Sequence, residues 1–202
     1  MYKKINISEI TLQILSLFTS KEKTIHIREA SKLCRCSPRS AQIALEQLEK
    51  KGVLSAQKKG NMKLFNIQNN TIAKQYLQFS LQHQTLCFFE EEQYIQEIIH
   101  HIKQHSRGIG ILFGSRVKKT NKKNSDIDVF VAGSANTKEI QKISKLYNIE
   151  IDVKIYSKKE FEKFTKKGEK DFLIEEIKKD HIVFSEIENY VEHIFYEKNP
   201  VV

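Results

Sequence analysis

The sequence has no hydrophobic run long enough to cross a membrane, and its 202 residues include only 3 cysteines and 2 prolines. A membrane-spanning helix needs about 20 predominantly apolar residues in a row. Residues 1–4 lead into a polar amphipathic segment, so we do not expect a signal peptide there. We therefore predict a cytoplasmic protein without a membrane partner. The few prolines beside many lysines, isoleucines and asparagines are typical of an AT-rich genome.

The cysteines do not follow a pattern that is typical of zinc sites. Cys34 and Cys36 form an isolated C-x-C, and Cys87 lies far away in the sequence. The adjacent His100 and His101 would point in two directions on a helix, so four converging ligands are not expected. We interpret the cysteines as core or surface residues of a protein from a reducing compartment.

Glycine patterns that bind nucleotides in other folds are absent as well. Gly108, Gly110 and Gly114 are spaced one residue too widely for a dinucleotide-binding fingerprint, and they precede or occupy a strand instead of following one. No Gly-Lys-Ser or Gly-Lys-Thr follows them, which excludes a P-loop.

Positive charge is concentrated in the first third of the chain. Residues 1–70 carry 13 Lys and Arg against 5 Asp and Glu, whereas residues 71–202 carry 21 against 20. Nearly all of the net charge of +9 therefore lies before residue 71. Because lysine and arginine supply most of the non-specific affinity for nucleic-acid phosphates, this asymmetry predicts a polyanionic partner for that third.

The same third contains three helical patterns and a hairpin pattern. Ser8 is expected to cap a first helix, a second covers 28–33, and Ser37 with Pro38 is expected to begin a third that stops at Gly52. This third helix is predicted to run through the apolar residues Ala41, Ile43, Ala44, Leu45 and Leu48. Residues 25–27 read as a short extended piece, and 53–57 with 62–67 read as a hairpin around Gly60-Asn61.

Three helices followed by a basic hairpin resemble a winged helix-turn-helix domain, and residues 48–54 close the third helix as is common in that family. The resemblance implies that this helix enters the DNA major groove while the hairpin touches the flanking backbone. It implies DNA contacts by Arg35, Ser37, Arg39, Ser40, Gln42, Lys58, Lys59 and Lys63. Alternatively, the domain serves protein docking or dimerisation. A homodimer that reads paired half-sites is compatible with both interpretations.

Residues 71–105 show helical spacing of apolar side chains without glycine or proline, which predicts two packed helices. We place Glu90 to Glu92 at a helix start, where the helix dipole favours acids. Two further helices are expected at 157–166 and 169–178, followed by a short strand at 180–184. A last amphipathic helix is expected at 188–196. His181 is interpreted as a surface residue at the start of that strand.

The segment 109–115 reads as an apolar strand followed by a Gly-Ser turn, and 125–131 reads as a second strand that opens with two carboxylates. Because side chains alternate along a strand, Asp126 and Asp128 would project from the same face and Ile127 would enter the core. Two carboxylates placed in this way can hold a divalent metal. A glycine at a strand end lets the backbone approach a phosphate, to which following N–H groups and a hydroxyl can donate.

A third carboxylate is expected on the strand 148–156, where apolar residues alternate with Glu150, Asp152 and Lys154. We favour Asp152 because it lies between apolar residues in mid-strand, and we keep Glu150 as the alternative. For either acid, a solvated position on the polar face of the strand stays open as the simpler interpretation.

Phe113-Gly114-Ser115, ten intervening residues and Asp126-x-Asp128 resemble the signature of DNA polymerase beta-like nucleotidyltransferases, most closely the small "minimal" type. The resemblance covers about 92–196, including the tail at 177–184. It implies that Asp126, Asp128 and Asp152 are catalytic and bind Mg²⁺ or Mn²⁺. It implies nucleotide contacts by Gly114, Ser115, Arg116 and Ser125. The spacer departs from the family because it carries four lysines where relatives often have an Arg-Gly pair, so the substrate stays open.

We predict an α/β (α+β) chain with three parts: a winged helix-turn-helix DNA-binding domain at 1–70, a helical connector at 71–91 and a nucleotidyltransferase domain at 92–202. The last is expected to contain a mixed sheet flanked by helices. We predict transfer of a nucleoside monophosphate from a nucleoside triphosphate to an acceptor, coupled to DNA binding. Two alternatives remain: a DNA-binding regulator with a nucleotide-sensing or inactive domain, and an antitoxin-like enzyme that modifies a toxin-like protein partner.

Overall fold

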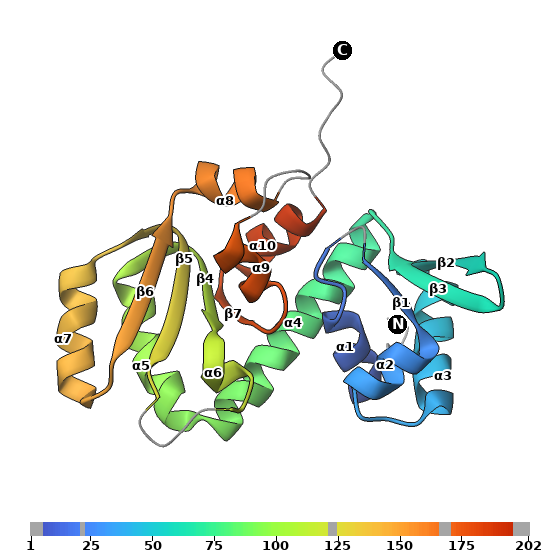
Figure 1. The fold of residues 1–202 in the computed structure, drawn as a ribbon, viewed down its shortest axis with the longest axis horizontal. Helices are drawn as coiled ribbons and strands as arrows, with labels where there is room; N and C mark the ends of the chain where they lie inside the picture. Colours follow the sequence, from blue (N-terminus) through green and yellow to red (C-terminus); the bar gives the residue numbers. More distant parts are fainter. Residues whose placement is uncertain (1–5, 21–22, 121–124, 166–170, 196–202) are drawn as a thin grey trace, which may run out of the picture. The chain divides into compact units, whose positions relative to one another are not determined.

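A computed structural model describes residues 6–20, 23–120, 125–165 and 171–195 of the chain. The chain divides into two compact units, residues 1–84 and 85–202 (Figure 1). Both units combine helices with a sheet, which confirms the predicted mixed α and β fold class. Within the described ranges, no helix has both the length and the apolar character of a membrane span.

The first unit contains three helices, α1 (Glu9–Ser16), α2 (Ile27–Leu33) and α3 (Pro38–Lys50). The hydroxyl of Ser8 caps α1 by accepting a hydrogen bond from the amide of Thr11, as the sequence predicted. Ser37 caps α3 in the same way, and Pro38 occupies its first turn. Gly52 follows the end of α3 with a φ of +71°, a conformation that favours glycine.

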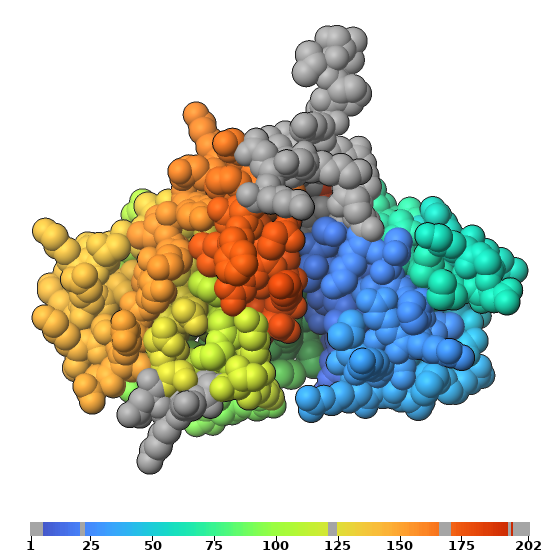
Figure 2. Space-filling view, in the orientation of Figure 1, coloured from blue at the N-terminus to red at the C-terminus, as the bar shows by residue number. Residues whose placement is uncertain are grey.

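Its sheet is formed by β1 (Thr24–His26), β2 (Leu54–Lys59) and β3 (Met62–Ile67) in the order β1-β3-β2, with antiparallel pairing. Lys59 pairs with Met62, so the hairpin turns at Gly60-Asn61 as predicted. The order helix, short strand, two helices and hairpin is that of a winged-helix topology. The hairpin is its wing, drawn in teal in Figure 2.

Of the five apolar residues through which the third helix was predicted to run, four face the core and Ile43 does not. Ala41, Ala44, Leu45 and Leu48 are buried, whereas Ile43 is 42% exposed. An α-helix has 3.6 residues per turn, so the four buried positions share one face of α3, and residue 43 lies on the opposite face. The exposed face of α3 therefore carries an apolar side chain among polar ones.

Residues 71–104 form the two predicted helices, α4 (Thr71–Glu91) and α5 (Gln93–Gln104). The hydroxyl of Ser80 donates to the carbonyl of Leu12 at 2.6 Å and so ties α4 to α1. The predicted position of the acids at a helix start is wrong for Glu90 and Glu91, which are the last two residues of α4. Only Glu92 stands directly before a helix, as the residue that precedes α5.

The second unit is built on a mixed sheet with the order β6-β5-β4-β7. Its strands are β4 (Ser106–Phe113), β5 (Ile127–Ala135), β6 (Ile151–Tyr156) and β7 (Ile182–Ser185). Strands β5 and β6 are parallel and are joined through α7 (Thr137–Tyr147), whereas β4 is antiparallel to both β5 and β7. The remaining helices are α6 (Gly114–Val117), α8 (Lys158–Thr165), α9 (Phe172–Ile177) and α10 (Ile187–Ile194).

Both faces of this sheet are covered. On one face, Val129 and Val131 of β5 pack with apolar residues of α5 and α7. On the other face, Phe130 contacts the ring of Phe161 in α8. Because helices cover both faces, β5 is buried continuously from residue 129 to 132. Alternation along β5 therefore places Asp128 on the Phe130 face, opposite Val129.

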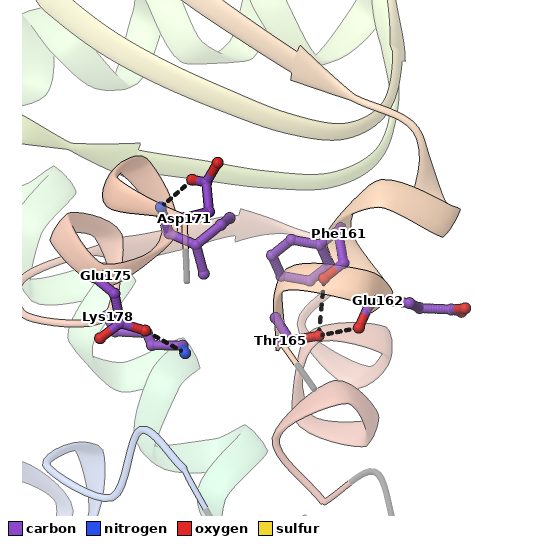
Figure 3. Close-up of polar contacts among 7 residues, drawn as sticks. Phe161, Glu162, Thr165, Asp171, Glu175 and Lys178 are labelled. Atoms are coloured by element: carbon purple, nitrogen blue, oxygen red, sulfur yellow. Dashed lines mark hydrogen bonds and ion pairs between the residues drawn. The ribbon is translucent and has the colours of Figure 1, made fainter. Parts of the chain in front are cut away.

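Polar contacts define the ends of α8 and α9 (Figure 3). The hydroxyl of Thr165 donates to the carbonyls of Phe161 and Glu162, which satisfies acceptors at the end of α8. The carboxylate of Asp171 accepts from the amide of Ile174 at 2.9 Å and caps α9. These contacts fix the segment from which Glu176 projects.

The prediction that His181 is a surface residue is wrong, because its side chain is only 4% exposed. Its Nε2 lies 2.7 Å from the hydroxyl of Tyr190 in α10. Burial raises the pKa of the Tyr190 hydroxyl far above its usual value, so that hydroxyl stays protonated. The pair joins the start of β7 to α10.

Gly110 lies in the middle of β4 at a position where no side chain fits. A Cβ there would lie 2.5 Å from Cζ of Phe184 in β7, well inside the contact distance of two carbon atoms. We expect Gly110→Ala to lower the free energy of unfolding of the second unit by about 1–3 kcal/mol, the usual cost of overpacking. Urea denaturation followed by circular dichroism measures this loss.

Two variants control this experiment. Ser134→Ala changes an exposed position of β5 and should leave the unfolding midpoint unchanged. Phe184→Leu should destabilise the Gly110→Ala protein less than it destabilises the wild type, because it removes part of the clash. A wild-type midpoint for Gly110→Ala would contradict the close packing of these two residues.

Candidate active site

The Gly-Ser turn lies directly against the acidic strand. Gly114 follows the last residue of β4 with a φ of +78°, and a Cβ on it would overlap the carboxylate of Asp128, 2.7 Å from Cγ. A side chain at position 114 would therefore meet both backbone strain and a clash. The absence of a Cβ lets the carboxylate of Asp128 rest on the backbone of the turn.

Strand pairing places two of the predicted acids side by side. Asp128 pairs with Phe113 of β4 on one side and with Asp152 of β6 on the other. Neighbouring strands lie about 5 Å apart, and paired residues of parallel strands project from the same face. Asp126 immediately precedes β5, and Glu150 immediately precedes β6. The fold thus gathers the predicted acids at one edge of the sheet.

The neighbouring acids perturb Asp128. Partial burial raises the pKa of Asp128 above its usual value, and the nearby carboxylates of Asp126, Asp152 and Glu176 raise it further. The ammonium group of Lys118 acts in the opposite direction. Burial and neighbouring negative charges destabilise the charged form of this carboxylate. A bound cation would stabilise it.

Two carboxylates of the site are suitable ligands for a magnesium ion. A ready-made set of three ligands is not present among the described residues. In the part of the chain that the structure describes, no three Asp, Glu, His or Cys side chains converge in an arrangement that would hold a metal. Asp152 is 41% exposed and forms an ion pair with Lys154 at 2.9 Å. Mg²⁺ is commonly held by one or two carboxylates together with substrate phosphates, so two carboxylates such as those of Asp126 and Asp128 would be enough.

Ser115 provides the second observation that points to a ligand. Its Oγ is buried and has no hydrogen-bond partner among the described residues. A buried hydroxyl without a partner costs free energy, and an acceptor such as a phosphate oxygen would remove that cost. Its carbonyl accepts from the amide of Thr120 at 3.0 Å, which closes the turn around the hydroxyl.

The basic residues after the turn are each held by another element. The guanidinium of Arg116 donates to the main-chain carbonyls of Ser125 and Asp126. Lys118 pairs with Glu176 of α9 at 2.9 Å, and Lys119 pairs with Glu91 of α4. The lysines at 122 and 123 lie outside the described residues.

Lys118 and Glu176 are the residues that the sequence interpretation missed. Glu176 belongs to α9 and is far from Asp128 in the sequence, although the fold brings the two side chains close together. No local sequence pattern could therefore have identified it. Lys118 stood out only as one of several lysines in the spacer. Together they add a cation and an acid beside the predicted site.

Some of the predicted DNA-contacting side chains of the first unit are exposed, and others form hydrogen bonds or ion pairs within the unit. Arg35, Arg39, Lys58 and Lys59 are exposed. The hydroxyls of Ser37 and Ser40 lie 2.9 Å apart at the cap of α3. Gln42 donates to Glu46 at 2.9 Å, and Lys63 pairs with Glu49 at 2.6 Å. The exposed cations therefore lie at the start of α3 and on the wing.

Comparison with protein families decides the identity of the second unit. The model of the nucleotidyltransferase domain family matches residues 95–199, about half of the chain. The chain belongs to this family. The match includes the Gly-Ser turn, Asp126, the strands that carry Asp128 and Asp152, and the helix that carries Glu176. A search of curated proteins found no significant match.

Among solved structures, similar chains share little sequence with this nucleotidyltransferase-family protein. The adhesin competence repressor AdcR from Streptococcus pyogenes is 16% identical, covering 45% of this chain and 67% of that chain with a TM-score of 0.37. The DNA-binding protein Sso10a-2 from Sulfolobus solfataricus is 20% identical, over 45% and 92%, with a TM-score of 0.33. The archaeal chromatin protein TrmBL2 is 11% identical, over 86% and 70%, with a TM-score of 0.30. These scores are too low to establish a shared fold.

The repulsion at Asp128 predicts a pH-dependent stability. The folded state raises the pKa of this carboxyl, so it holds the proton more tightly than the unfolded chain, and stability falls as the pH rises through the interval between the two pKa values. We expect Asp128→Asn to raise the melting temperature near neutral pH by up to about 2 °C, allowing for solvent screening. The gain should shrink toward zero as the pH falls below about 4. Differential scanning calorimetry measures both.

A variant with the same charge change controls for general electrostatics. Glu90→Gln alters an exposed carboxylate and should give no comparable pH-dependent gain. Equal melting temperatures of the wild type and Asp128→Asn across this pH range would show that the site does not penalise the charge of Asp128.

Proposed function

We propose that the chain is a nucleotidyltransferase of the minimal type, dependent on Mg²⁺ or Mn²⁺, that transfers a nucleoside monophosphate from a nucleoside triphosphate to an acceptor hydroxyl. The observation that carries this proposal is the packing of the Asp128 carboxylate on Gly114, which places an acid next to the buried, unpartnered hydroxyl of Ser115. Membership of the nucleotidyltransferase family supports it. We assign this activity to residues 92–202.

Each residue of the site has a distinct role in this proposal. Asp126 and Asp128 hold the metal, which when bound neutralises triphosphate charge and helps to align the reacting oxygens. Ser115 and the amides of the turn donate to phosphate oxygens. Asp152 orients the acceptor hydroxyl or accepts its proton. The acceptor oxygen forms a bond to the α-phosphorus while the bond to the pyrophosphate leaving group breaks.

We further propose that the first unit binds DNA. Arg35 and Arg39 at the start of α3 would face the major groove, and Lys58 and Lys59 on the wing would neutralise backbone phosphates. The winged-helix topology and the net positive charge of residues 1–70 support this assignment. In this proposal residues 71–91 connect the two functions.

One observation favours a second candidate function. Asp152 is paired with Lys154, and among the described residues no three potential ligands are arranged to hold a metal. A site with two effective carboxylates suits nucleotide binding even if transfer is slow. The chain would then be a DNA-binding regulator that senses a nucleotide, and nucleotide would change its DNA affinity without being consumed.

Labelled nucleotides test the transferase proposal. With each α-labelled nucleoside triphosphate and Mg²⁺, we expect the wild type to bind nucleotide and to release pyrophosphate. Asp128→Asn should lose most of this activity, and Ser115→Ala should weaken triphosphate binding about tenfold, the usual loss of a hydrogen bond to a charged group. Filter binding and a pyrophosphate assay measure the two effects.

The same assay distinguishes the candidates. Metal-dependent binding without pyrophosphate release, together with a nucleotide-dependent shift in DNA affinity, favours the sensor. The absence of metal-dependent nucleotide binding by the wild type would overturn both. Lys138→Ala, a change at an exposed position of α7, serves as the control and should behave as the wild type.

Salt dependence tests the proposed DNA contact by the wing. If Lys58 neutralises one phosphate, Lys58→Ala should weaken binding to all duplex sequences alike and lower the slope of log affinity against log salt by about 1. Fluorescence anisotropy over a salt series measures the slope, with Lys138→Ala as the matched control. A slope equal to that of the wild type would remove Lys58 from the interface.

A further inference from the structure

Asp126 and Asp128 are held by different means, although both are expected to bind the same metal. Asp128 is the second residue of β5 and is paired with strands on both sides. Asp126 lies just outside β5, which begins at Ile127, whose amide donates to the carbonyl of Glu150 at 2.9 Å. Strand pairing therefore fixes Asp128 but stops one residue short of Asp126.

The side chain of Arg116 reaches the main chain at this point. Its Nε lies 3.0 Å from the carbonyl oxygen of Asp126 and 3.1 Å from that of Ser125, and its Nη2 also donates to Ser125. Arg116 belongs to α6, the short helix that begins with Gly114 and Ser115. One side chain thus connects the Gly-Ser turn to the residue that the strand does not hold.

The partners of Arg116 differ from those of the neighbouring lysines. Lys118 and Lys119 each pair with a carboxylate, whereas the partners of Arg116 within the described residues are neutral carbonyls. Adjacent carbonyls suit the rigid, planar fork of a guanidinium, which a flexible lysine ammonium does not reproduce. The shape of the donor group, more than its charge, explains an arginine at this position.

We propose that Arg116 is a positioning residue of the metal site, which fixes the Asp126 carboxylate relative to Asp128 by clamping the backbone at residues 125 and 126. The inference rests on the proposed metal-dependent function and refines it. Arg116 acts on the metal through Asp126 and is not a ligand of the triphosphate.

Metal binding without nucleotide tests this role. We expect the wild type to bind Mn²⁺, as measured by electron paramagnetic resonance. Arg116→Ala and Arg116→Lys should both weaken binding by about tenfold or more, the usual effect of losing a group that orients a metal ligand. Lys119→Ala removes a neighbouring positive charge and should bind Mn²⁺ as the wild type does. Thermal melts confirm that each variant is folded.

A double-mutant cycle separates positioning from a general structural effect. If Arg116 acts through Asp126, Arg116→Lys should weaken Mn²⁺ binding in the wild type but not in the Asp126→Asn background. Additive losses would overturn the inference. An Arg116→Lys protein that binds Mn²⁺ as tightly as the wild type would also overturn it. The strongest contrary result would be a triphosphate affinity that falls in Arg116→Ala and returns in Arg116→Lys.

The outcome also separates this inference from the proposed function. The expected Mn²⁺ pattern without pyrophosphate release would leave the positioning role in place and remove the transferase activity. Mn²⁺ binding with an unaffected Arg116→Lys would overturn the positioning role alone. No Mn²⁺ binding by the wild type would overturn both the positioning role and the metal site.

Discussion

The contact between the Asp128 carboxylate and the backbone of Gly114 is the constraint on which the rest of the site depends. It requires a residue without a Cβ at position 114 and the register that pairs Phe113 with Asp128. A shift of one residue between β4 and β5 would turn Asp128 to the opposite face of the sheet. The same contact holds Asp128 beside the turn that carries Ser115, so the Gly-Ser turn and the acidic strand lie together.

Electrostatics gives this site its chemical character. Asp126, Asp152 and Glu176 lie close enough to Asp128 to raise its pKa. Lys118 pairs with Glu176, and Lys154 pairs with Asp152. Partly buried like charges favour a cation between them, and a metal-bound triphosphate supplies both a cation and acceptors for Ser115. The expected ligands of the two units, DNA and a nucleoside triphosphate, both carry phosphates. In the first unit, exposed arginines and lysines would contact them. In the second unit, the Gly-Ser turn and a bound metal would do so.

Local sequence signals predicted the elements of both units, because caps, glycine stops and apolar periodicity act over a few residues. Ser8, Ser37 and Gly52 mark helix ends where expected, and Asp128 and Asp152 lie on neighbouring strands. The errors concern long-range packing. His181, expected at the surface, is buried and contacts Tyr190. Glu176 reaches the site from α9, and Arg116 contacts main-chain carbonyls, which carry no sequence signal at all.

A crystal structure of the protein with Mn²⁺ and a non-hydrolysable nucleoside triphosphate tests the central claim most directly, through the anomalous signal of the metal. The account predicts an anomalous peak in contact with the carboxylates of Asp126 and Asp128, and a phosphate oxygen within hydrogen-bond distance of Ser115 Oγ. A nucleotide bound elsewhere on the chain, or a metal that contacts neither carboxylate, would contradict it.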